Sequence, residues 1–105
     1  MSEVNVRTHR AGRKGWDTGF VTIPTTEADL VGQTIYVSSI YISNTSAVAV
    51  IVTLKEKGTG RIVFNRSLAA GEVVNLFFAE PIRFEGGIRH SASASGAVIH
   101  VAGYL

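Results

Sequence analysis

Apolar residues in this 105-residue chain recur at every second position within short runs, which is the period of a half-buried β-strand. Turn signals, mostly containing glycine, separate these runs at intervals of about eight to twelve residues. The pattern predicts an all-β fold of about eight short strands, an antiparallel β-sandwich or jelly-roll-like domain. The expected strands cover residues 18–23, 34–44, 47–55, 61–68, 73–79, 81–84, 88–95 and 97–104.

Two segments depart from regular alternation. The apolar positions of residues 34–44 change parity after Val37. A period of two cannot change face without an irregularity, so we expect a β-bulge or a strand break at Ser38-Ser39. The polar segment at residues 25–30 has a Thr and an Asp at capping-box spacing, and it suggests one helical turn capped by Thr26.

The candidate core comes from the inward parity of the apolar runs. With 46% apolar residues, a chain of this length can bury one core and form a single domain. The segment 47–54 is apolar or neutral on both parities, which favours a central strand or a subunit contact. The residues expected to be largely buried are Val50, Val52, Leu54, Phe64, Leu76, Phe78, Phe84 and Val101.

Positive charge is concentrated at the N-terminus. Residues 1–15 contain four basic residues against Glu3 alone, a net charge of +3, whereas residues 16–105 contain six basic and seven acidic residues, a net charge of −1. We therefore divide the chain into a basic N-terminal arm (1–15) and a β-sandwich domain (16–105). The arm either becomes ordered on a partner or is a plain solvated tail. Its candidate partner-binding residues are Arg7, Arg10, Arg13 and Lys14.

Residues that could support catalysis, metal binding or a cofactor are scattered. The three histidines His9, His90 and His100 have no nucleophile elbow near them, and without cysteine they match no zinc-site spacing. We therefore expect no catalytic, metal-binding or cofactor-binding residues and no enzymatic activity. No apolar run has the length of a signal peptide or a membrane span, which favours a protein made in the cytoplasm with no membrane partner.

Several turns and strands together resemble the small β-sandwich structural proteins of tailed bacteriophages. The shared pattern consists of a strand, an Asn-Thr-Ser turn, a Val-rich strand, a Leu-Ala-Ala-Gly turn, a Pro-Ile-x-Phe edge and a Gly-Tyr ending. It lies in residues 39–55, 67–76, 80–84 and 97–104. The resemblance implies a virion protein, most simply a capsid decoration (cement) or head–tail accessory subunit. It also implies a symmetric homo-oligomer, with a trimer as the first expectation, bound to the major capsid protein or to other virion proteins. No catalytic or ligand residue carries over, because the family pattern contains none.

Two other functions stay open on the sequence. A carbohydrate- or receptor-binding module could use exposed aromatic side chains, for which Trp16, Tyr36 and Tyr41 are candidates. A nucleic-acid-binding protein could use the basic arm together with Trp16, although Trp16 is placed equally well to close the bottom of the core. We favour the core position for Trp16.

Overall fold

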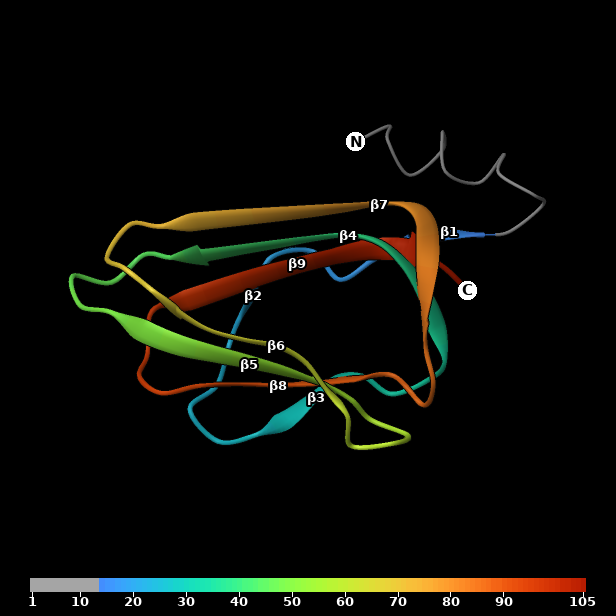
Figure 1. The fold of residues 1–105 in the computed structure, drawn as a ribbon, viewed down its shortest axis with the longest axis horizontal. Coiled ribbons are helices and arrows are strands. Elements are labelled where there is room, and N and C mark those ends of the chain that lie inside the picture. Colours follow the sequence, from blue (N-terminus) through green and yellow to red (C-terminus); the bar gives the residue numbers. More distant parts are fainter. Residues whose placement is uncertain (1–13) are drawn as a thin grey trace.

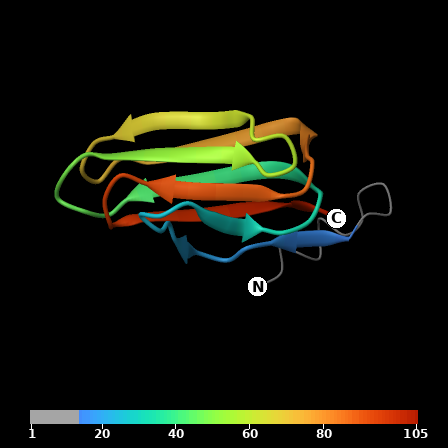
Figure 2. The ribbon, with the colours of Figure 1, turned by 90° about the horizontal axis from the view of Figure 1, so that it is seen from below.

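The computed structural model describes residues 14–105, and within them it contains nine strands and no helix. Figure 1 shows the strands running along the long axis of the domain, and Figure 2 shows the same ribbon seen from below. The strands are β1 (Gly15–Asp17), β2 (Val21–Thr22), β3 (Ala28–Val31), β4 (Ile35–Asn44), β5 (Val50–Glu56), β6 (Ile62–Leu68), β7 (Val73–Phe84), β8 (Ile88–Ala92) and β9 (Ala97–Tyr104).

The strands form two antiparallel sheets. One sheet has the order β1-β9-β4-β7, with β2 also paired to β9, and the other has the order β3-β8-β5-β6. If β1 and β2 are counted as one interrupted strand, the first strand pairs with the last, the second with the seventh, the third with the sixth and the fourth with the fifth. A long hairpin rolled up on itself gives this arrangement, which is the jelly roll that the strand pattern predicts.

The core lies between the sheets and is built from one parity of each strand. The alternation of buried and less buried residues along β4 and β5 follows the period of two. In β4 the register with both neighbours shifts between Val37 and Ser39, which confirms the irregularity predicted at Ser38-Ser39. Because of this bulge, Ile35 and Ile40 both face the core despite their opposite parity.

Two local predictions were wrong. Residues 28–31, expected to continue a helical turn, form β3, because pairing of Asp29 with Arg89 of β8 satisfies the backbone in extended form. The strands expected at residues 73–79 and 81–84 are a single strand. Strand β7 continues to Phe84, and only its register with β4 is interrupted between Phe77 and Ile82.

Asn44 holds one end of the sandwich together. Its side chain is fully buried, and its amide nitrogen donates to the main-chain carbonyls of Val48, Leu68 and Ala69 at 2.8, 3.0 and 3.1 Å. Its amide oxygen accepts from the N–H and the hydroxyl of Ser46 at 3.0 and 2.7 Å. Asn44 of the predicted Asn-Thr-Ser turn therefore cross-links the two sheets, because it ends β4 in one sheet and bonds Leu68, which ends β6 in the other.

Candidate assembly surface

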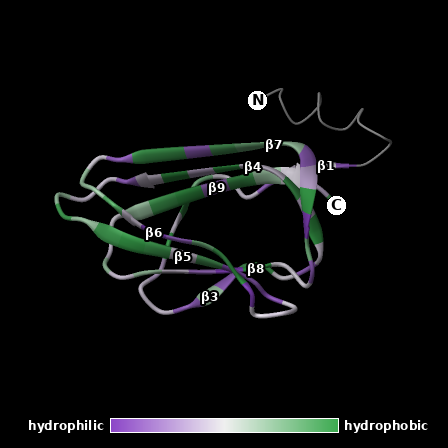
Figure 3. Cartoon of the chain, in the orientation of Figure 1, coloured by the Kyte–Doolittle hydropathy of each residue, from purple (hydrophilic) through white to green (hydrophobic). Residues whose placement is uncertain are grey.

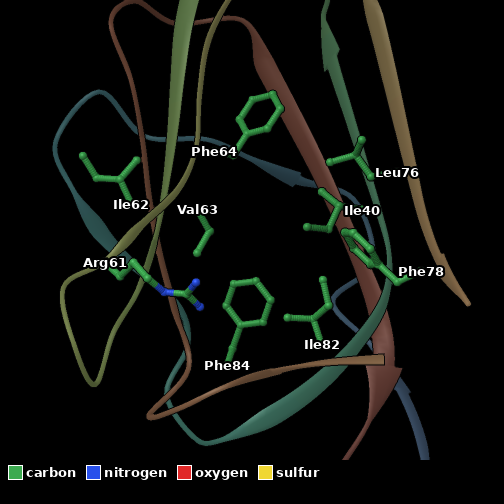
Figure 4. Close-up of a pocket in the computed structure, with 9 residues that line it drawn as sticks. All are labelled: Ile40, Arg61, Ile62, Val63, Phe64, Leu76, Phe78, Ile82 and Phe84. Carbon is green, nitrogen blue, oxygen red and sulfur yellow. The ribbon is translucent and has the colours of Figure 1, made fainter. Parts of the chain in front are cut away.

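An apolar groove runs between the free edges of the two sheets, along strands β6 and β7. It has a volume of about 320 Å³, and aliphatic and aromatic side chains line it almost throughout. Figure 4 shows these side chains converging from β6 on one side and from β4 and β7 on the other. The lining residues are Ile40, Arg61, Ile62, Val63, Phe64, Leu76, Phe78, Ile82 and Phe84.

The groove leaves part of the predicted core unfinished. Five of the eight residues expected in the core are buried, namely Val50, Val52, Leu54, Phe84 and Val101. The other three, Phe64, Leu76 and Phe78, pack against the core but stay only partly buried, and all three line the groove. Their spacing marks them as core residues, so the groove is where the single chain leaves its core incomplete.

Among residues 14–105, β7 is the longest of the strands at a sheet edge, and its charged and proline residues (Glu80, Pro81 and Arg83) all lie in its second half. Natural edge strands are usually short, charged or interrupted by proline, because an open row of main-chain groups can pair with another chain. Strands β1 and β3 are short, and β3 contains Asp29, while β6 contains Arg66. Residues 73–79 of β7 contain neither a charged residue nor a proline. This edge is therefore open to pairing.

Two of the outward-facing residues of β7 are also apolar. Phe77 is 78% exposed and Val73 is 48% exposed, and both lie on the outer face of the sheet, opposite serines of β4. In Figure 3 the first half of β7 is coloured hydrophobic over most of its length. The strand thus presents apolar side chains to the groove on one face and to solvent on the other.

A second aromatic group lies farther across the same outer face. Phe20, which is 70% exposed, packs edge-on against Tyr41 with ring centroids 5.6 Å apart. Its ring also lies over His100 at 4.9 Å. The imidazole Nε2 of His100 lies 3.6 Å from a carboxylate oxygen of Asp17.

The outer face of the opposite sheet carries several paired charges beside the exposed Ile51 of β5. Lys55 contacts Glu27 at 2.8 Å and Lys57 contacts Asp29 at 2.6 Å, while Arg89 lies within 3.4 Å of both carboxylates. The hydrogen bond from Lys55 lowers the pKa of Glu27, and the one from Lys57 lowers the pKa of Asp29. The charges on this face already have partners, whereas the face around β7 has exposed apolar groups.

Of the predicted partner-binding residues, only Lys14 falls within the described residues. Lys14 is exposed and directly precedes β1, and its main-chain carbonyl accepts from the Leu105 N–H at 3.1 Å. Arg7, Arg10 and Arg13 lie outside the described residues. Trp16 of β1 is half-buried and packs against the core cluster, which agrees with the core position favoured for it.

The two described histidines lie in different sheets, His90 in β8 and His100 in β9. His90 is buried in β8, and burial lowers the pKa of its imidazole. Within residues 14–105 no group of three or more His, Asp or Glu side chains lies close enough together to hold a metal ion. The described part of the chain also contains no helix long and apolar enough to cross a bilayer.

The sequence contained a signal for this surface that the strand assignment did not use. In residues 73–78 the apolar side chains occupy both parities, and only Asn75 interrupts them. We assigned Leu76 and Phe78 to the core and left Val73 and Phe77 without a role. A strand that is apolar on both parities is covered on both faces, and for an edge strand a partner must provide part of that cover.

Comparisons with known proteins show a likeness in fold alone. No protein-family model matches the chain, and no curated protein matches it. Among solved structures, a chain from Bacillus endospore appendages, which form disulfide-linked pili, is similar with a TM-score of 0.47. The two chains are 14% identical over 89% of this chain and 87% of that one. The present chain has no cysteine and so cannot form disulfide links.

Proposed function

We propose that this chain is a virion structural protein of a tailed bacteriophage, a capsid decoration or head–tail accessory subunit without enzymatic activity. In this proposal it assembles in the host cytoplasm as a homo-oligomer and binds the particle lattice through its arm and the surface of the sandwich. The observation that carries the proposal is the open β7 edge beside the apolar groove, because such an edge suits a protein that functions in contact with other subunits.

The second part of the proposal is that the N-terminal arm binds the particle. Ordering a flexible segment costs about 1–2 kcal/mol per residue. An exposed ion pair returns only about 0–1 kcal/mol. The charges of Arg7, Arg10, Arg13 and Lys14 therefore steer the arm to an acidic neighbour, and apolar and main-chain contacts of the arm must supply most of the affinity.

The test measures binding to particles. A variant in which the four arm charges are reversed, and a second variant starting at Gly15, are compared with the full chain for co-sedimentation with purified phage particles. The shortened variant loses one described hydrogen bond, from Leu105 to Lys14, so it should still fold. We expect both variants to lose binding, and charge reversal to matter more at low salt.

Three results would decide against parts of this proposal. If the shortened variant decorates particles as well as the full chain does, attachment lies on the sandwich and the arm is only a tail. If the full chain is absent from purified particles and does not bind them, the virion role is wrong. A mass of 11.2 kDa at micromolar concentration would contradict the homo-oligomer, and the measured mass would also test the expected trimer.

A carbohydrate- or receptor-binding function is the second candidate, and the cluster of Phe20, Tyr41 and His100 favours it. Exposed aromatic rings beside polar groups can stack on sugar faces, and Phe20 is 70% exposed beside Tyr41 and His100. Of the three aromatic residues first considered, Tyr41 lies in this cluster, while Trp16 packs against the core. Glycan-specific binding by the wild-type chain, lost in Phe20→Ala, would support this function over the first.

A further inference from the structure

The hydrogen-bond pattern between β4 and β7 shows which main-chain groups of β7 face outward. The N–H of Asn44 donates to the carbonyl of Glu72 at 2.9 Å, so this carbonyl points toward β4. In an antiparallel ladder, positions whose main-chain groups face the neighbouring strand alternate with positions whose groups point away from it. The next non-hydrogen-bonded positions on β7 are Val73, Asn75 and Phe77, in register with Ser43, Tyr41 and Ser39 of β4. Their N–H and C=O groups therefore point away from β4, toward the free edge.

These outward groups limit how a second strand can pair with β7. A partner strand must place its own outward residues opposite Val73, Asn75 and Phe77. Residues 73–77 are uncharged, so pairing them with the same residues of a second copy brings no like charges together. The edge is in this sense complementary to itself.

We propose that β7 pairs with β7 of a second copy of this chain, antiparallel and across a two-fold axis at Asn75. The inference rests on the proposed self-assembly and specifies its contact. In this register Val73 lies opposite Phe77 of the second copy, and Phe77 lies opposite its Val73. The two most exposed apolar side chains of the strand thereby cover each other as aromatic–β-branched pairs, which stabilise cross-strand contacts.

The position on the axis suits an asparagine. A side-chain amide has both donor and acceptor groups, so two copies of Asn75 facing each other can exchange hydrogen bonds. Asn75 is exposed in the single chain, so this contact needs no rearrangement of the core. On the other face of the strand, Val74 lies opposite Leu76 of the second copy, beside the groove.

Neighbouring registers are less favourable. An axis at Leu76 would place Glu72 directly opposite Glu80 of the second copy, and like charges in that position are destabilising. An axis at Phe77 would place Val73 opposite Pro81, which has no N–H to donate. The register at Asn75 uses all three outward positions and avoids both conflicts.

The same contact covers the groove. Leu76 and Phe78 line it from β7, and joining two copies along this edge brings their two grooves together. The partly buried side chains of each chain would then contact those of the other. A two-fold contact gives a dimer, or a hexamer where it combines with the three-fold contact of a trimer.

Cysteine cross-linking tests the register, because the chain contains no cysteine and any cross-link is unambiguous. Under mild oxidation we expect most of the full-length Asn75→Cys variant to form a disulfide-linked dimer. Residues in a hydrogen-bonded antiparallel pair have Cα atoms about 5.5 Å apart, within the range of disulfides. The matched control is Asn65→Cys, an exposed asparagine on the free edge strand β6, which should stay monomeric on a non-reducing gel.

A second pair of variants tests the contact without oxidation. Asn75→Asp puts two like charges on the axis and should raise the dissociation constant of the oligomer by about tenfold at low salt, and by less at high salt. Asn65→Asp should leave that constant unchanged. Sedimentation equilibrium of the full chain measures both.

Each alternative outcome has a definite meaning. If Asn75→Cys cross-links no faster than Asn65→Cys, the proposed contact is wrong, whether the chain is a monomer or an oligomer. If the oligomer dissociates when residues 1–14 are removed, the arm of a neighbour covers the edge instead. If Asn75→Cys cross-links but the protein does not bind particles, this contact stands and the virion function fails.

Discussion

Replacing the aromatic ring of Phe78 by alanine measures how complete the core is in the single chain. Phe84 is the matched control, because it lies on the same strand and parity but is only 2% exposed. Deleting a buried phenylalanine side chain costs about 3–5 kcal/mol, and we expect that loss for Phe84→Ala. Phe78 is partly buried and faces the groove, so Phe78→Ala should lose about half as much in a single chain, about 1.5–2.5 kcal/mol.

Urea unfolding followed by the fluorescence of Trp16, the one tryptophan of the chain, provides the assay. With a denaturant slope of about 1.5 kcal/mol per M, the midpoint should fall by about 2–3 M for Phe84→Ala and by about 1–1.7 M for Phe78→Ala. The measurement is repeated at low and high protein concentration. Because a second copy would cover the groove, the loss for Phe78→Ala should increase with protein concentration, while the loss for Phe84→Ala should not.

Three results would each refute part of this reasoning. Equal losses for the two variants at the lowest concentration would mean that Phe78 is fully buried in the single chain and that the groove is closed. A loss below about 0.5 kcal/mol would mean that Phe78 behaves as a surface residue. If the loss of unfolding free energy in Phe78→Ala does not depend on protein concentration, no second copy covers the groove, contrary to the proposed assembly.

Three further predictions concern the folded domain. Asn44→Ala should lower the free energy of unfolding in urea by about 2–4 kcal/mol, because the buried Leu68 carbonyl loses its donor; a loss below about 0.5 kcal/mol would contradict the cross-linking role. Gly103→Ala should lower the melting temperature, because an added Cβ would meet the Tyr36 carbonyl oxygen, and an unchanged melting temperature would show that the strands can separate there. Thermal melts between about pH 4 and pH 8 should show the melting temperature decreasing as the pH falls below about 6.5, because burial lowers the pKa of His90 and only the unfolded imidazole readily binds the proton. His90→Leu should reduce this dependence of the melting temperature on pH, and an unchanged dependence would assign it to other groups.

The pH dependence has a second part at lower pH. The Glu85 N–H and the Thr59 hydroxyl donate to the nearly buried Glu56 carboxylate at 2.7 Å each, and these hydrogen bonds lower the pKa of Glu56. A group whose pKa is lowered on folding stabilises the fold fully above its unfolded value of about 4.5 and loses that contribution as the pH falls through the folded value. The loss of stability at low pH that protonation of Glu56 causes should therefore persist in the His90→Leu variant.

Only part of the candidate surface could be read from the sequence. The apolar residues on both parities of 73–78 indicated a strand covered on both faces, but they could not show that this strand lies at a sheet edge. The groove depends on residues from β4, β6 and β7, which are distant in the chain and meet only in the folded domain. The partial exposure of Phe64, Leu76 and Phe78 results from how these three strands are arranged in the folded domain, and the spacing of the residues in the sequence does not predict it.

The sequence by itself determined the all-β class, most strand positions and the bulge in β4, because side-chain parity and turn residues are local properties of the chain. It did not determine the strand at residues 28–31, where pairing with β8 outweighs a weak helical capping signal. Only the tertiary structure decided which strands lie at the edges of the sheets, because paired strands are often far apart in the sequence. Edge position is what leaves one side of β7 without a neighbouring strand among residues 14–105 and leaves apolar side chains of β7 exposed, and both proposals rest on it.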